Sequence, residues 1–315
     1  MNNRFNLCLI GLTLCIALLT VCRTSENNQE SINNSLLYLS LLQSSCSEEF
    51  GQELEFLHLH PSIRHYAGSG NTGYADGFGS MAEFQSPSAL STNCAAVFLA
   101  DAHRIRRVSI NDPDVITIYE HHDTIVSLNF SDSNLYFMDA FGFVYQISET
   151  GASRSAISEP TGEIPVRVLI RASGGYYLYA DRLEYHAPEP VGSIQIILSG
   201  LDAAGDVLAV NGQFYVSEKS GTEIVQYDSS GSEVQRRNLD TVPGDAIIAL
   251  TTDSRRLYAV SRGVSEDFVV AFRLNNFNRY GLIQNLGHMG FASILAAEDD
   301  LFLSDQSGKQ ILRID

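Results

Sequence analysis

Short apolar stretches rich in aromatic and β-branched residues recur along the chain, and each of them ends at a polar residue. These final residues are Asp101, Asp139, Asp181, Glu218, Ser261 and Asp305. The intervals between them run from 37 to 44 residues. Each stretch has the length and composition of a strand that is covered on both faces. An interval of about 40 residues fits one four-stranded propeller blade, so the pattern predicts six blades.

Each blade is expected to have an inner strand before this stretch, a third strand after a short turn, and a fourth strand on the outside. The last blade has no fourth strand after residues 310–315. Residues 62–68 precede the first complete blade and have the right length to supply it. Pairing them there removes a row of open backbone hydrogen-bonding groups. We therefore expect an all-β, six-bladed β-propeller over residues 62–315, closed by an N-terminal strand that completes the last blade.

Residues 66–107 resemble an NHL repeat. A glycine-rich connection ends at Ala82, Phe84 and Pro87, and it is followed by an apolar strand, the strand VFLAD and the strand RIRRV. Weaker copies of the second half of this pattern recur in the other blades. The resemblance implies a propeller of the NHL-repeat family, of the bacterial exported or lipoprotein type. Because one fold carries many functions, the chemistry has to be argued from individual residues.

The first 61 residues are expected to export and tether the propeller. Arg4 is followed by an apolar run from Leu7 to Leu19, which fits a signal-peptide core and is too short to span a bilayer. Residues 1–21 are therefore predicted to be a signal peptide. Residues 19–22 resemble a bacterial lipobox, which makes Cys22 the lipidation candidate and residues 22–61 a tether and leader. This places the propeller in the periplasm or at the cell surface. An uncleaved anchor and simple secretion stay open.

Cys46 and Cys94 are the cysteines left outside the signal peptide and the lipobox. In an oxidising compartment two such thiols pair when their Cα separation allows it. Cys94 lies in the expected turn between the first two strands of blade 1, on the face where the leader enters. A Cys46–Cys94 disulfide is thus a candidate, and two free thiols are the alternative.

Charge argues against nucleic acid as a partner. The chain has 37 Asp and Glu against 20 Lys and Arg, a formal net charge of -17. Such a surface repels a phosphate backbone, and the arginines form no run.

Polar residues in the turns that share the top face of the expected propeller are the candidates for ligand binding. They are Asp76, Asp101, His103, Asp139, Asp181, Glu218 and Asp305. A carboxylate at a strand end more often accepts backbone N–H groups of a turn, so a structural role is the alternative for each.

No catalytic residue, metal ligand or cofactor is assigned. The sequence shows no nucleophile elbow and no phosphate loop. Amidating lyases of related architecture hold zinc with histidines of the central channel, and the expected inner strands here contain none. Propeller lactonases hold calcium with oxygen ligands, for which the inner strands offer Asn129, Asp206, Asn211 and Asp245.

The sequence therefore predicts a non-catalytic, exported NHL-repeat propeller that acts as a binding scaffold for a protein or glycan at the cell envelope. It is anchored to the membrane by lipid at Cys22 and displays its top loops to the partner. The alternative is a calcium-dependent hydrolase or lactonase of the propeller type. A structural or sensory envelope subunit is a third possibility.

Overall fold

The computed structural model describes residues 62–158, 162–171, 173–188, 192–238, 246–253, 255–274, 279–283, 286–298 and 300–314, the backbone alone for residues 279–283. The expected signal peptide, tether and leader, with Cys22 and Cys46, lie outside these residues. No helix in the described part of the chain is long and apolar enough to cross a membrane.

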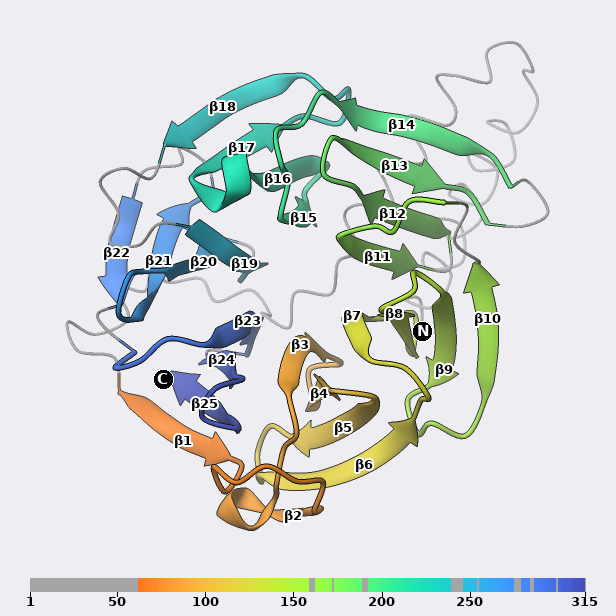
Figure 1. Cartoon of the computed structure of the whole chain (residues 1–315). Helices are drawn as coiled ribbons and strands as arrows, with labels where there is room; N and C mark the ends of the chain where they lie inside the picture. The colour runs from red at the N-terminus through yellow and green to blue at the C-terminus, as the bar shows by residue number, and fades with distance from the viewer. Residues whose placement is uncertain are drawn as a thin grey trace, which may run out of the picture. The chain divides into compact units, whose positions relative to one another are not determined.

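Six antiparallel sheets stand in a ring, each with its first strand at the centre and its last strand outside (Figure 1). Blade 1 contains β3 (Pro87–Thr92), β4 (Ala96–Asp101), β5 (Arg104–Ser109) and β6 (Asp114–Glu120), with the short β2 (Gly77–Phe78) outside them. Blade 2 contains β7 (Ile125–Ser131), β8 (Asn134–Asp139), β9 (Val144–Ser148) and β10 (Arg154–Ser158). Blade 3 contains β11 (Arg167–Arg171), β12 (Gly174–Leu178), β13 (Arg182–His186) and β14 (Ile194–Ser199).

The remaining blades repeat this order. Blade 4 contains β15 (Asp206–Val210), β16 (Gln213–Glu218), β17 (Glu223–Tyr227) and β18 (Glu233–Asn238). Blade 5 contains β19 (Ala246–Thr252), β20 (Arg256–Arg262), β21 (Asp267–Arg273) and β22 (Arg279–Ile283). Blade 6 contains β23 (Phe291–Ala297), β24 (Asp300–Asp305), β25 (Gln310–Ile314) and β1 (Ile63–Ala67). The predicted six-bladed architecture is confirmed.

The ring is closed by the N-terminal strand, as the sequence predicts. β1 pairs antiparallel with β25, with Ile63 opposite Ile314. From this strand the hydroxyl of Tyr66 reaches blade 1, where its single hydrogen is shared between the carbonyls of Ser109 and Ile110, each 2.6 Å away. Blade 6 is therefore completed by β1 and tied to blade 1 by Tyr66 of the same strand.

The second strands carry the core. All six residues of β4 and all six of β24 are buried, because the two faces of each blade pack against neighbouring blades. In blade 3 this strand begins and ends earlier than the sequence suggests, at Gly174 and Leu178, and the expected strand end Asp181 lies in the following turn.

Polar side chains join neighbouring blades at their inner strands. Each offers an oxygen to a backbone N–H of the next inner strand, which leaves fewer unpaired backbone groups between the blades. The pairs, side chain first, are Ser91 with Phe130 at 2.7 Å, Asn129 with Ile170 at 2.9 Å, Asp206 with Leu250 at 2.8 Å, Thr251 with Ala296 at 3.1 Å and Ser293 with Leu90 at 3.4 Å. The inner strands β11 and β15 are joined by an ion pair between two side chains, Arg167 and Asp206, at 2.9 Å.

Candidate functional site

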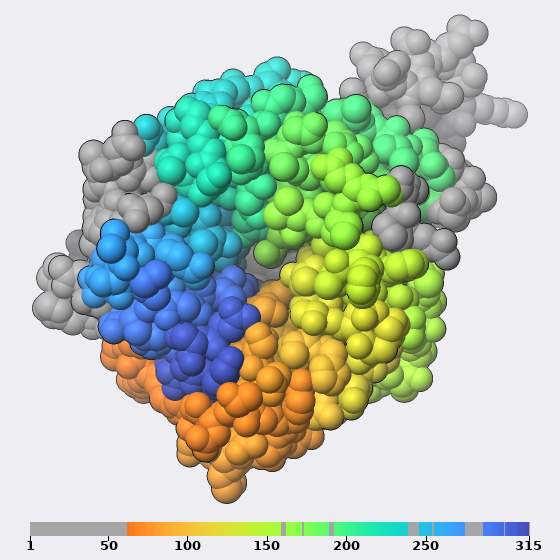
Figure 2. Space-filling model, in the orientation of Figure 1, coloured from red at the N-terminus to blue at the C-terminus, as the bar shows by residue number. Residues whose placement is uncertain are grey.

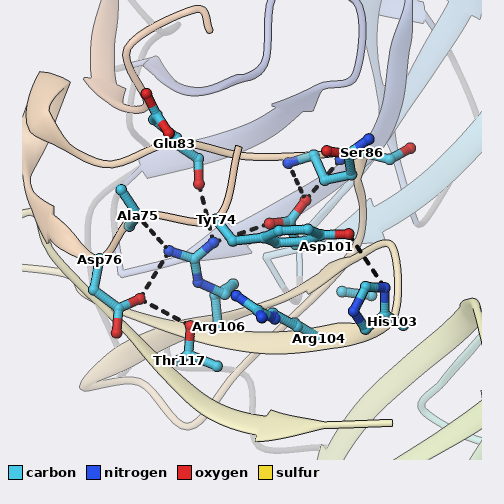
Figure 3. Close-up of polar contacts among 12 residues, drawn as sticks. Tyr74, Ala75, Asp76, Glu83, Ser86, Asp101, His103, Arg104, Arg106 and Thr117 are labelled. Carbon is cyan, nitrogen blue, oxygen red and sulfur yellow. Dashed lines mark hydrogen bonds and ion pairs between the residues drawn. The ribbon is translucent and has the colours of Figure 1, made fainter. Parts of the chain in front are cut away.

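The top face of the ring carries the turns between second and third strands and the connections from each fourth strand to the next blade. Figure 2 shows one face of the ring, which is hollowed at its centre. Asp76, Asp101 and His103, three of the residues expected here, lie together on blade 1 (Figure 3).

Arg106 of β5 organises this part of blade 1 although its side chain is fully buried. Its guanidinium lies 2.9 Å from Oδ2 of Asp101 and 2.9 Å from Oδ1 of Asp76. It also donates to the carbonyls of Glu83 at 3.0 Å and Ala75 at 2.9 Å. One buried cation thus fastens the glycine-rich connection to the blade, a contact that sequence reasoning missed because Arg106 looked like one of several scattered arginines.

Asp101 performs a structural task. Its Oδ1 accepts the N–H groups of Gln85 at 2.8 Å and Ser86 at 2.7 Å. Burial raises the pKa of Asp101, while the Ser86 N–H and the Arg106 guanidinium oppose this rise. The sequence suggested a cap on the following turn. The structure shows a cap on the loop that leads into the inner strand of the same blade.

An accessible rim lies beside this buried network. The hydroxyl of Tyr74 is 3.2 Å from Nδ1 of His103, and the guanidinium of Arg104 stands 4.1 Å from the centre of the Tyr74 ring. Glu120 approaches both Arg104, at 3.1 Å, and His103, at 3.7 Å. Burial raises the pKa of Tyr74, so its hydroxyl keeps its proton at neutral pH. The rim offers a positive, aromatic and acidic group side by side.

The other top-face candidates lie one to a blade and do not converge. Asp139 accepts the N–H groups of Phe141 at 2.9 Å and Phe143 at 3.0 Å. Asp305 accepts the N–H of Gly308 at 2.7 Å. These two carboxylates are fully buried and cap the turn that follows them.

Glu218 and Asp181 behave differently from those caps. Buried Glu218 accepts a hydrogen bond from the hydroxyl of Tyr227, whose pKa is raised by burial and by this carboxylate. Asp181 is 66% exposed and pairs with Arg182 at 2.8 Å. In blade 5 the capping residue is Asp267, which sequence reasoning missed because it begins the third strand and does not end the second. It accepts the N–H groups of Gly290 and Phe291 at 2.9 Å each.

The oxygen ligands considered for calcium do not form a set. Asn129 and Asp206 hold the backbone of the neighbouring inner strand. Asp206 and Asn211 lie at opposite ends of β15, and Asp245 is outside the described residues. Partly buried Asn129 and buried Asp206 therefore serve the junctions between blades.

A cleft of about 500 Å³ opens between blades 2 and 3. Aromatic and charged side chains line it together, and those that matter most below are Tyr136, Glu163, Arg171, Tyr177, Tyr179 and His186. The sequence did not predict it. The available signal was the run Gly174 to Tyr179, where two glycines meet three tyrosines in one blade.

Close packing and stacked rings shape the blade 3 wall of this cleft. Gly174 and Gly175 begin β12, and the side chains of Tyr185 and Ile170, of the same blade, fill the space that a Cβ would take at each. The ring of Tyr177 stacks on His186 with centroids 4.0 Å apart, and its hydroxyl donates to Ser158 of blade 2 at 3.3 Å. Burial raises the pKa of Tyr179 to about 12, so its hydroxyl stays protonated at neutral pH.

Comparisons with known proteins agree on the fold. No protein-family model matches the chain, and no curated protein matches it either. A structural genomics protein of unknown function from Bacteroides thetaiotaomicron is 13% identical over 81% of this chain and 75% of its own, with a TM-score of 0.62. An auxiliary nutrient binding protein from the same organism is 12% identical over 81% and 77%, with a TM-score of 0.61. A chain of a nidogen/laminin complex is 16% identical over 67% and 85%, with a TM-score of 0.55.

The chain is a six-bladed β-propeller. At these identities the likeness extends to the fold alone, and an NHL-type repeat stays a prediction. The Cys46–Cys94 pairing also stays a prediction. Cys94 lies in the turn between β3 and β4 as one half of a disulfide, and its predicted partner, Cys46, is outside the described residues.

Proposed function

We propose that the chain is a non-catalytic, exported NHL-repeat propeller, anchored by lipid at Cys22, that binds a glycan in the cleft between blades 2 and 3. The cleft itself carries the proposal. Its volume of about 500 Å³ suits a small ligand or a short stretch of polymer. Its lining combines tyrosine rings with a few charged groups, which is the composition of sites that bind amphipathic ligands.

A sugar ring has an apolar face of C–H groups and a rim of hydroxyls. Tyr136, Tyr177 and Tyr179 line the cleft but are only 3–5% exposed, so they form its aromatic floor, and we propose that such a face packs against this floor. Glu163, Arg171 and His186 bring hydrogen-bonding groups to the same space. Glu163 is 54% exposed and lies 2.9 Å from Arg182, so its carboxylate is held at the mouth and is open to a ligand.

The carboxylate count favours binding without cleavage. Glycoside hydrolysis ordinarily needs two carboxyl groups that flank the scissile bond. Among the described residues that line the cleft, Glu163 is the one carboxylate. Asp101, Asp139 and Asp305 are occupied as caps on the top face.

Two structural neighbours support a binding role. One is described as an auxiliary nutrient binding protein, and another is a chain of a nidogen/laminin complex. Export and lipidation rest on the apolar run before Cys22 and the polar tether after it. A lipid-anchored propeller on such a tether presents its surface to soluble polymer outside the membrane.

The test is binding of the full mature chain to a panel of soluble polysaccharides, followed by calorimetry with the best oligosaccharide. We expect Glu163→Gln and His186→Ala each to weaken binding at least about tenfold, because hydrogen bonds to charged groups are worth about 1.5–3 kcal/mol. Glu120→Gln is the matched control, since Glu120 is 58% exposed and pairs with arginine on blade 1. No binding by any glycan, equal losses in all three variants, or release of new reducing ends would each overturn the proposal.

The anchor is tested separately. Cys22→Ser is expected to abolish incorporation of labelled fatty acid and to move the protein from the membrane fraction to the soluble fraction. Labelling that persists in Cys22→Ser would overturn the anchor and leave the cleft proposal standing.

A further inference from the structure

The connection from blade 1 to blade 2 carries His121, His122 and Asp123 in a row on the top face, between β6 and β7. One nitrogen or oxygen atom from each of the three lies within 4.8 Å of the others. The side chain of His121 is fully buried, that of His122 is 67% exposed and that of Asp123 is 26% exposed. The cluster therefore has one buried member, His121, and two members that solvent reaches, His122 and Asp123.

A buried carboxylate orients His121. Nε2 of its ring lies 3.3 Å from Oδ2 of Asp139, which is itself buried in blade 2. An ionised carboxylate only accepts, so Nε2 carries the imidazole hydrogen and Nδ1 keeps its lone pair. Nδ1 is buried and has no hydrogen-bond partner among the described residues. A buried acceptor without a partner is uncommon in folded proteins and calls for an explanation.

The surroundings hold this ring in place. The backbone N–H of His121 donates to the carbonyl of His103 at 2.8 Å. Its ring packs against Phe137 and Tyr145, with centroids 5.2 and 4.9 Å away. The ring of His122 lies 4.1 Å from that of His121. A histidine whose second nitrogen is bonded to a carboxylate and whose ring is locked by packing has the arrangement of a metal-ligating histidine.

We propose that His121, His122 and Asp123 bind a divalent transition-metal ion of the zinc type, with Asp139 as the residue that positions His121. Imidazole nitrogen and carboxylate oxygen are ligands that zinc accepts at about 2.0–2.2 Å, which puts neighbouring ligand atoms roughly 3.3 Å apart. The ligand atoms lie within 4.8 Å of one another, so each pair has to shift by at most about 1.5 Å to reach this spacing. Exposed His122, now 2.7 Å from Asp123, has room to adjust.

This site is distinct from a channel zinc site, because its ligands lie on a connection between blades and not on inner strands. Three protein ligands leave one position of a tetrahedral ion for water or for a group of a partner. An ion there would also fasten the connection between blades 1 and 2 to the Asp139 turn.

The experiment is calorimetric titration of the full, untagged, chelator-treated mature chain with zinc chloride, and with cobalt chloride as a spectroscopic probe. We expect one equivalent of zinc to bind, and cobalt to show visible bands of nitrogen and oxygen ligation without a thiolate charge-transfer band. His122→Ala and Asp123→Asn, at accessible positions, are each expected to lower the affinity at least about tenfold. Asp139→Asn is expected to lower it 10–100-fold and to change the cobalt spectrum.

His288→Ala is the matched control. His288 lies beside buried Asp305 at 2.6 Å, as His121 lies beside Asp139, and it is not part of the cluster. We expect this variant to bind zinc like the parent chain. Absence of zinc binding, a thiolate band with cobalt, or unchanged affinity in both His122→Ala and Asp123→Asn would overturn the proposal. If Asp139→Asn does not fold, those two variants decide the result.

Discussion

The guanidinium of Arg106 lies 2.9 Å from the carboxylate of Asp101, and neither side chain has any exposure to solvent. Removing one member of such a pair leaves an uncompensated buried charge. We expect Arg106→Met to lower the free energy of unfolding by about 3–5 kcal/mol, measured by urea denaturation. Arg104→Met, in the same strand but with its charge on the accessible rim, is expected to cost about 1 kcal/mol or less. Equal losses in the two variants would contradict this account.

Closure of the ring gives a second prediction. Tyr66→Phe removes the hydroxyl that bonds two carbonyls of blade 1 and keeps the ring that packs on Phe302. The expected loss is about 1 kcal/mol in the free energy of unfolding. Tyr119→Phe serves as the control, because the structure shows no hydrogen bond from the Tyr119 hydroxyl to any described residue. If Tyr66→Phe and the parent chain have the same free energy of unfolding, the hydrogen bond of the Tyr66 hydroxyl does not stabilise the propeller.

His121 predicts a dependence of stability on pH. Burial lowers the pKa of His121 from the ordinary value of 6.5, and the hydrogen bond to Asp139 only partly opposes this. The unfolded chain therefore takes up a proton at a higher pH than the folded chain. The contribution of neutral His121 to the free energy of unfolding is therefore complete above pH 6.5. It is lost as the pH falls toward the pKa of His121 in the folded chain.

Denaturation in metal-free buffer between about pH 7.5 and pH 5.5 checks this linkage. We expect the free energy of unfolding to decrease with acidification, and the slope to become smaller in His121→Gln. His122→Gln should keep most of the slope, since burial of His121 is the larger cause and remains. The same slope in the parent chain and in His121→Gln would rule out His121 as the source.

A substitution of Asp206 distinguishes the proposed binding scaffold from the alternative of a calcium-dependent enzyme. Its carboxylate accepts the N–H of Leu250 at 2.8 Å and pairs with Arg167 at 2.9 Å, and burial raises its pKa against the opposing effect of Arg167. We expect Asp206→Asn to lower the free energy of unfolding by about 1–3 kcal/mol, equally with and without calcium. Thermal melts with calcium and with chelator measure this. A calcium-dependent rise in the melting temperature that disappears in Asp206→Asn would favour the enzyme instead.

The sequence could predict the blades because their signal is local. Each second strand is a short, mainly apolar stretch, and residues 62–68, just before the first complete blade, have the length of a closing strand. Five of the six second strands end at the expected polar residue or one residue beyond it. The exception is β12, whose second-strand signal runs on to Asp181 although pairing ends at Leu178.

The candidate sites depend on contacts between residues that lie apart in the sequence, which a linear pattern does not encode. The cleft is lined by residues of blade 2, such as Tyr136, and of blade 3, such as Tyr177. The environment of His121 is set by Asp139, which lies 18 residues further along the chain. Asp101 was expected to cap a turn, and its actual partners, Gln85 and Ser86, precede it in the chain. In each case the residue types were visible and the distances were not.

The pairing of β1 with β25 also determines when the ring can close during synthesis of the chain. β1 is the first described strand to leave a ribosome, and its partner, which ends at Ile314, is the last. Until that partner arrives, β1 has no strand to pair with, and the loop to be closed spans nearly the whole propeller, which makes closure a late and slow step. Without residues 310–314, β1 would leave an unpaired edge on blade 6. Completion of the ring therefore depends on both of these strands.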